Sequence, residues 1–94
     1  MQFVFDPDKD ATNLGKHGLS LAAAAEISWE AALVWLDDRA DYGEVRMVAL
    51  APIGDILFFV AFVDRETKRR IISLRRANRR EFNHYVKAIT EDQP

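Results

Sequence analysis

Two apolar segments near the middle of the chain form the clearest hydrophobic pattern in the sequence. Residues 56–63 contain no polar side chain before Asp64, which is typical of a central strand covered on both faces. Residues 44–51 are also mostly apolar, and the turn-forming sequence 52–55 (Pro-Ile-Gly-Asp) joins the two segments. The pattern therefore predicts a β-hairpin. The aromatic residues expected in its core are Phe58, Phe59 and Phe62.

The segments on either side of this hairpin predict further strands. The segment 32–36 is short and contains β-branched and aromatic side chains. Residues 68–74 are expected to form a strand with Arg70 and Ile72 on one face and Arg69, Ile71 and Ser73 on the other. Polar residues fill positions 37–43, which predicts a loop. The sheet is therefore expected to be antiparallel, with about four strands.

Helix signals stand near both ends of the chain. Asp6-Pro7 is an N-cap followed by proline, and Gly18 is a stop signal, so a helix is expected over about residues 7–16. Ser20 before the alanine run 22–25 predicts a second helix. A third helix is expected over about residues 78–89, with an apolar arc that docks on the sheet and a basic opposite side. The residues of that arc are Phe82, Tyr85, Val86 and Ile89.

This order of elements predicts an α+β fold with two N-terminal helices, an antiparallel sheet and a C-terminal helix. The length of 94 residues fits one domain, 1–94, with a single core and a shallow site. The chain has no cysteine, which excludes disulfides, thiolate zinc sites and cysteine nucleophiles and fits the reducing cytoplasm. The apolar run at 56–63 is far shorter than a membrane helix, and residues 1–10 do not resemble a signal peptide, so no membrane role is expected.

Charge is segregated along the chain. Residues 65–87 hold nine Lys/Arg against two Glu, a net charge of +7 in a protein whose total is −2, whereas residues 1–64 carry −7. Apolar residues 71, 72 and 74 interrupt the basic run, so it belongs to folded structure and not to a polybasic tail. Arginine binds phosphate with a bidentate fork, so the basic segment predicts a polyanionic partner such as nucleic acid. The alternative is a solvated face whose arginines pair with the acidic first half.

Few residues could carry acid-base chemistry. Lys16 and His17 stand at the end of the first expected helix, where the helix dipole alone could explain them, or His17 could transfer a proton near neutral pH. Glu44 and Arg46 share one face of an expected strand, where they could pair, or Glu44 could act as a base. His84 falls on an exposed helix face and is not expected to take part.

The sequence lacks the usual motifs for metals and cofactors. Its two histidines are far apart, and no glycine-rich phosphate loop, dinucleotide fingerprint or nucleophile elbow is present, so neither a metal nor a cofactor is expected. RNA supplies its own nucleophile, the 2′-hydroxyl, so cleavage needs only a base, an acid and cations near the phosphate. The chain contains all three types of group.

The order of residues adds a resemblance to a known family. The motif Asn-x-x-Lys-His-Gly at 13–18, the sequence Glu-Val-Arg at 44–46 and the motif Arg-Ile-Ile-Ser-x-Arg-Arg-Ala at 70–77 together resemble the BrnT family of toxins. The resemblance covers nearly the whole chain. It implies a RelE-like fold, ribonuclease activity that inhibits translation without a metal, and neutralisation by a BrnA-like antitoxin with a ribbon-helix-helix DNA-binding domain. Operator DNA would be reached only through that antitoxin.

Site residues follow from the resemblance together with the charge pattern. The expected catalytic residues are His17, Glu44, Arg70, Arg75 and Arg76. The expected RNA-binding residues are Lys16, Arg46, Ser73, Arg79, Arg80 and Tyr85. The three arginines of the catalytic set would hold the scissile phosphate, and His17 or Glu44 would transfer protons.

Two questions stay open at this stage. The chain could instead be a non-catalytic module that binds nucleic acid or a partner and serves as the antitoxin's co-repressor. Trp29 and Trp35 are expected in the core, with a partner or self-association surface as the alternative.

Overall fold

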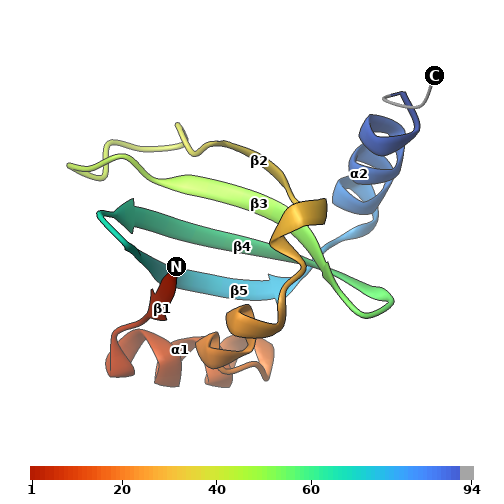
Figure 1. Cartoon of the computed structure of the whole chain (residues 1–94). Helices are drawn as coiled ribbons and strands as arrows, with labels where there is room; N and C mark the ends of the chain where they lie inside the picture. The colour runs from red at the N-terminus through yellow and green to blue at the C-terminus, as the bar shows by residue number, and fades with distance from the viewer. Residues whose placement is uncertain (92–94) are drawn as a thin grey trace.

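The computed structural model describes residues 1–91 and shows an α+β fold built on one five-stranded mixed sheet (Figure 1). The strand order across the sheet is β1-β5-β4-β3-β2. The strands are β1 Gln2–Val4, β2 Leu33–Leu36, β3 Met47–Ile53, β4 Ile56–Arg65 and β5 Lys68–Arg76. The helices are α1 Pro7–His17, the 3-10 helices η1 Leu21–Glu26 and η2 Trp29–Ala31, and α2 Arg79–Glu91. A single domain over 1–94 stays a prediction, and residues 92–94 lie outside the described residues.

The predicted hairpin is confirmed as β3 and β4. Their register runs from Met47 opposite Phe62 to Ile53 opposite Ile56, which leaves a two-residue turn. Gly54 occupies that turn with a φ of 58°, a left-handed conformation that glycine adopts without strain. Strand β3 begins later than expected, so Glu44 and Arg46 precede it in the loop after β2.

The expected antiparallel sheet of four strands is wrong in one respect, because the N-terminus adds a fifth strand, β1. Residues Gln2–Val4 pair in parallel with residues 68–70 of β5. A three-residue strand has no detectable alternation, and its partner lies more than 60 positions later in the chain. All other neighbouring strands are antiparallel, as predicted.

Helix α1 forms as the sequence predicts. The Asp6 carboxylate accepts a hydrogen bond from the Asp8 backbone N–H at 2.8 Å, and Pro7 occupies the first turn. Gly18 ends the helix at a φ of 70°, and its N–H donates to the Leu14 carbonyl. The end of α1, with Lys16 and His17, is therefore well defined.

The second predicted α-helix is wrong, because the alanine run forms the 3-10 helix η1. The buried residues Leu21, Ala24 and Ile27 recur every three positions, which places them on one face of a helix with three residues per turn. The Asp10 carboxylate also accepts from the Leu21 backbone N–H at 2.7 Å and ties this segment to α1. Packing onto the sheet outweighs the preference of alanine for an α-helix.

The two faces of the sheet differ in their cover. On one face, here called the covered face, η1 and η2 pack over the sheet, whereas α1 lies along the free edge of β5 (Figure 1). The side chains of the other face, here called the open face, form a second buried cluster. That cluster consists of Val48, Leu50, Leu57, Phe59 and Ala61, with Ile72, Ala77 and Tyr85 packed against it.

Helix α2 forms near its predicted position but does not dock through its apolar arc. Phe82, Val86 and Ile89 are 51%, 40% and 44% exposed, so the expected docking is wrong for these three residues. The helix leaves the end of β5 and projects away from the sheet (Figure 1). Periodicity marked an apolar face correctly but could not show what covers it.

The two tryptophans have different environments. Trp29 stacks on Phe3, meets Phe62 edge to face, and donates its indole N–H to the Ala24 carbonyl, so its predicted core position is confirmed. Trp35 lies on edge strand β2, is 38% exposed and contacts His84 of α2. The core prediction is therefore wrong for Trp35, because β2 is an edge strand and Trp35 stays partly exposed beside α2.

Candidate active site

A groove between α1 and the edge of β5 brings together three of the predicted site residues. Lys16 and His17, both exposed on the last turn of α1, line it together with Ser73 of β5. Its volume is about 400 Å³. The groove exists because β1 pairs only with the first residues of β5 and leaves the rest of that edge to α1.

Ser73 connects this groove to the open face of the sheet. It pairs with Ala61, a member of the open-face cluster, and directly paired residues point to the same side of a sheet. Arg75 pairs with Phe59 and Arg70 pairs with Val63, so both arginines share that side with Ser73. The expectation that Arg70 and Ser73 lie on opposite faces is wrong, because the register shifts between Ala61 and Phe62 and interrupts the simple alternation. Three predicted residues of β5 thus lie in one row, with the groove of His17 beside them.

Arg75 is fixed by a carboxylate at the start of α2. Its two terminal nitrogens each donate to a Glu81 oxygen at 2.8 Å, and its guanidinium lies 4.2 Å from the Phe59 ring centroid. The Arg75 guanidinium lowers the pKa of Glu81, against the opposing effect of partial burial. Glu81 also forms a reciprocal cap with Asn78, so one residue both starts α2 and holds Arg75.

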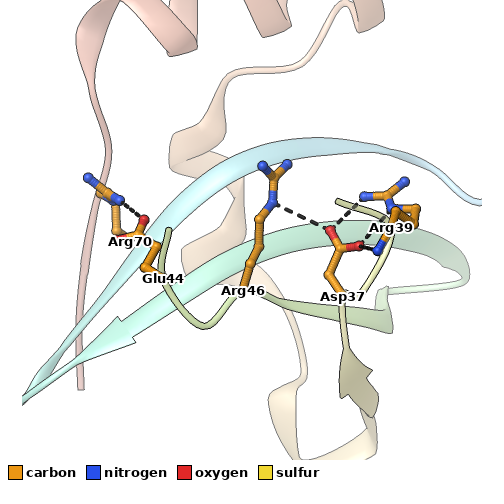
Figure 2. Close-up of polar contacts among 5 residues, drawn as sticks. All are labelled: Asp37, Arg39, Glu44, Arg46 and Arg70. Carbon is orange, nitrogen blue, oxygen red and sulfur yellow. Dashed lines mark hydrogen bonds and ion pairs between the residues drawn. The ribbon is translucent and has the colours of Figure 1, made fainter. Parts of the chain in front are cut away.

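Arg70 is also paired with a carboxylate. It donates to one oxygen of Glu44 (Figure 2). Arg65 donates to the other oxygen at 3.2 Å. The structure therefore brings together Glu44 and Arg70, two predicted catalytic residues. Because both oxygens of Glu44 accept from arginines, Glu44 holds cations in place and is poorly prepared to act as a base.

Arg46 belongs to a third charged group, centred on Asp37. The Asp37 side chain is 1% exposed, and its two oxygens accept from Arg39 at 2.7 and 2.8 Å. The Nε of Arg46 lies 3.5 Å from the same carboxylate (Figure 2). The hydrogen bonds from Arg39 hold the pKa of Asp37 at about 2, below its ordinary value of 3.8. Asp37 is therefore ionised at neutral pH and fixes two arginines.

The remaining basic candidates lie elsewhere. Arg76 pairs with Phe58, whose side chain belongs to the covered-face core, so it points away from Arg75. Arg76 and Arg79 line a separate shallow groove where β5 meets α2. Arg80, in the first turn of α2, is exposed. The structure does not bring these three arginines to the row formed by Arg70, Ser73 and Arg75.

Tyr85 anchors α2 to the rest of the molecule. Its hydroxyl donates to the Ala31 carbonyl at 2.6 Å, and its ring packs against the open-face cluster. This contact explains how α2 is held although its other apolar residues are exposed. The geometry favours an anchoring role for Tyr85 over the predicted RNA contact.

Sequence reasoning missed three residues that organise this surface: Asp37, Arg39 and Glu81. Asp37 and Arg39 stand in a stretch that looks like an ordinary polar loop, because burial of a single carboxylate leaves no trace in a local pattern. Glu81 was detectable, since Asn78 followed by glutamate three positions later is a capping-box spacing.

Other kinds of site can be considered for the described part of the chain, residues 1–91. No group of three or more His, Cys, Asp or Glu side chains is placed there to hold a metal ion. No helix in that part is long and apolar enough to cross a membrane.

Comparison with known proteins adds an independent observation. A family model described as the ribonuclease toxin BrnT of type II toxin-antitoxin systems matches residues 5–81 of the 94-residue chain. The match spans α1, strands β2 to β5, and the Glu81 that holds Arg75, and it leaves out β1. A search of curated proteins finds no match.

Proposed function

Since this chain belongs to the BrnT family of ribonuclease toxins of type II toxin-antitoxin systems, we propose that it is an endoribonuclease that cleaves RNA through the substrate's own 2′-hydroxyl. The 2′-oxygen attacks the adjacent phosphorus while it loses its proton. The bond from phosphorus to the 5′-oxygen breaks, and that oxygen takes up a proton. The products are a 2′,3′-cyclic phosphate and a free 5′-hydroxyl. No metal ion is part of the proposal.

The position of Ser73 is the observation that carries this proposal. Ser73 lines the groove of Lys16 and His17 and also stands in the open-face row with Arg75. A phosphate bound at Ser73 would have a histidine on one side and arginines on the other. Histidine is well suited to proton transfer near neutral pH, and guanidinium groups stabilise the charge that develops on phosphate oxygens.

Arg75 is suited to that role because its carboxylate partner does not occupy all its donors. A guanidinium has five N–H groups, and Arg75 uses three of them, two on Glu81 and one on the Arg76 carbonyl. The remaining two can reach a phosphate without breaking the ion pair. Glu81 therefore orients Arg75, as a preorganised site requires.

The experiment that tests the proposal compares the two histidines of the chain. Purified protein is incubated with RNA in excess EDTA, and the ends of the fragments are analysed. The proposal expects new ends with a 2′,3′-cyclic phosphate for the unchanged protein and for His84→Ala, and a loss of at least about 100-fold in rate for His17→Ala. Equal cleavage by both variants would overturn the assignment of His17. Retention of RNA without any new ends would instead favour a binding module.

The cellular part of the proposal follows the family. The toxin would cleave RNA in the cytoplasm, inhibit translation, and be neutralised by a BrnA-like ribbon-helix-helix antitoxin, through which alone it would reach operator DNA. A RelE-like fold is part of the same proposal. Expression of the chain alone should arrest growth, and co-expression of the antitoxin gene or the change His17→Ala should relieve the arrest. Harmless expression of the unchanged chain would contradict it.

A further inference from the structure

The loop between β2 and β3 carries a charged group that the proposed reaction does not use. Asp37 is buried, and two arginines share its carboxylate, which leaves this group a net charge of +1. The Asp37 backbone N–H also donates to the Arg46 carbonyl at 2.8 Å, so the two ends of the loop are joined beside this group. One buried carboxylate thus holds both cations at the edge of the open face, where the Arg39 side chain is 59% and the Arg46 side chain 20% exposed.

Arg46 holds its guanidinium in an unusual way. Its Nε is buried without a hydrogen-bond partner within residues 1–91, although the Asp37 carboxylate is 3.5 Å away. The guanidinium lies 4.2 Å from the Tyr42 ring centroid, and its terminal nitrogens point away from Asp37 (Figure 2). Neither terminal nitrogen donates a hydrogen bond within the described part of the chain, so both are available to an anion. A partly buried cation with free donors is typical of an anion site.

The group lies close to the residues of the proposed site. Arg39 and Arg75 both contact the Phe59 ring, at 5.6 and 4.2 Å from its centroid, which places the two guanidinium groups no more than about 10 Å apart. On the other side, Arg46 directly precedes Met47, which pairs with Phe62, and the next residue of β4, Val63, pairs with Arg70. Strands β3 and β5 are two strand spacings apart, about 10 Å, so the start of β3 brings Arg46 near Arg70.

We propose that Arg39 and Arg46, positioned by Asp37, form a second phosphate subsite beside the Ser73 and Arg75 site. The subsite binds a backbone phosphate of the same RNA strand, either the phosphate next to the scissile one or the phosphate after that. The substrate class is therefore single-stranded RNA with several phosphates, and not a dinucleotide. This inference rests on the proposed ribonuclease function and specifies how that site holds its substrate.

A merely structural role is the competing explanation, in which Asp37 only joins the ends of the loop. The two explanations predict opposite signs for the change Asp37→Asn. This change removes a negative charge next to the surface, so simple electrostatics raises the affinity for RNA. If Asp37 positions the two arginines, its loss releases them and the affinity falls in spite of the added positive charge.

The first experiment measures RNA binding without cleavage. His17→Ala serves as the background, and the probe is a fluorescent single-stranded RNA of about 12 nucleotides, followed by anisotropy from about 50 to 200 mM salt. Adding Arg39→Ala or Arg46→Ala should weaken binding about 5- to 30-fold and reduce the slope of log K against log salt by about 0.7 each. The matched control Lys87→Ala, which removes a charge from the exposed side of α2, should change affinity less than about twofold. Equal effects of all three changes would overturn the subsite.

The second experiment guards against variants that fail to fold. Arg39→Lys and Arg46→Lys keep the charge but lose the planar fork, and Asp37→Asn keeps the shape of the side chain. For variants that show a cooperative thermal transition, the subsite expects weaker binding in all three. Unchanged binding by both lysine variants, or tighter binding by Asp37→Asn, would overturn it.

These measurements separate the subsite from the proposed function. If the unchanged protein cleaves RNA but its RNA affinity does not depend on Arg39 and Arg46, the subsite is wrong and the ribonuclease function stands. If RNA affinity depends on both arginines but no RNA is cleaved, the ribonuclease function is wrong and the protein has an RNA-binding site for two phosphates.

Discussion

Asn13 and Leu74 are 61 positions apart and are joined by two hydrogen bonds. The Asn13 amide nitrogen donates to the Leu74 carbonyl at 2.8 Å, and the Leu74 N–H donates to the Asn13 side-chain oxygen at 3.0 Å. A side-chain amide here replaces the neighbouring strand that β5 lacks beyond its short pairing with β1. The pair fixes α1 against β5, and with it the position of Lys16 and His17 relative to Ser73.

The change Asn13→Asp should disrupt this pair strongly. Aspartate cannot donate to the carbonyls of Leu74 and Leu19, and a carboxylate would be buried in place of the 4% exposed amide. We expect the free energy of unfolding to fall by about 3 kcal/mol or more, measured by chemical denaturation. RNA cleavage should fall as well. The control Asn83→Asp, on the exposed side of α2, should leave stability within about 0.5 kcal/mol, and an equally small effect at Asn13 would contradict the role given to this pair.

The lowered pKa of Asp37 should make the free energy of unfolding depend on pH in the acidic range. Its pKa is about 2 in the folded protein and 3.8 ordinarily, so the folded state binds the proton less readily than the unfolded chain. The stabilisation is complete above pH 3.8 and is lost as the pH falls towards 2. The shift corresponds to about 2 kcal/mol of unfolding free energy lost over that window.

Denaturation at several pH values checks this dependence. Asp37→Asn should be less stable at neutral pH by about 2 kcal/mol and should lose less stability on acidification, because the titrating group is gone. Asp55→Asn changes an exposed carboxylate without an ion pair in the described residues, and should follow the unchanged protein. Parallel curves for Asp37→Asn and Asp55→Asn would show that Asp37 does not carry the effect.

Glu81 is expected to orient Arg75 for a phosphate. Glu81→Gln keeps an acceptor for the Asn78 N–H but removes the charge that holds the guanidinium. We expect a loss of about 1 kcal/mol in stability, since both side chains are partly exposed, and an RNA affinity that falls about two- to fivefold in spite of the lost negative charge. Glu91→Gln changes net charge equally but affects only the pair with Lys87. If both changes tighten binding to the same extent, the gain is due to overall charge and not to Arg75.

Tyr85 should behave as an anchor. Tyr85→Phe removes only the hydroxyl that donates to the Ala31 carbonyl, so about 1 kcal/mol should be lost and the Tm should fall by about 4 to 8 °C. The rate of RNA cleavage below the transition should stay within about twofold of the unchanged protein. A large loss of cleavage rate at an unchanged Tm would instead support the RNA contact of Tyr85 that was expected from the sequence.

The sequence predicted those elements whose signals are local. The uninterrupted apolar residues of β4 indicated a central strand, and Asp6-Pro7 with Gly18 marked both ends of α1. The errors involve partners far along the chain. Strand β1 depends on residues 68–70 for its pairing, η1 on the sheet beneath it, and the apolar face of α2 on a cover that local periodicity cannot reveal.

The residues of the candidate site also divide into those that local motifs predicted and those whose contacts depend on distant parts of the chain. Lys16, His17 and Ser73 could be expected to meet because two sequence motifs carry them, and the structure places them in one groove. The carboxylates that hold the arginines could not be foreseen from Asp37 or Glu44 alone, since ion pairing depends on register between strands. Arg75 and Arg76 are consecutive residues of β5, so their side chains point to opposite faces of the sheet. This could have been expected for neighbours in a strand, but the prediction grouped the arginines by charge alone.

The parallel pairing of β1 with β5 has a consequence for the time at which the protein can act. Strand β1 cannot pair until residues 68–70 have been synthesised, and α1 cannot form its hydrogen bonds to Leu74 before that residue exists. The groove is therefore assembled only after most of the chain has been made. Contacts over such long separations close slowly and form together. An incomplete chain on the ribosome therefore lacks the groove in which the proposed reaction would take place.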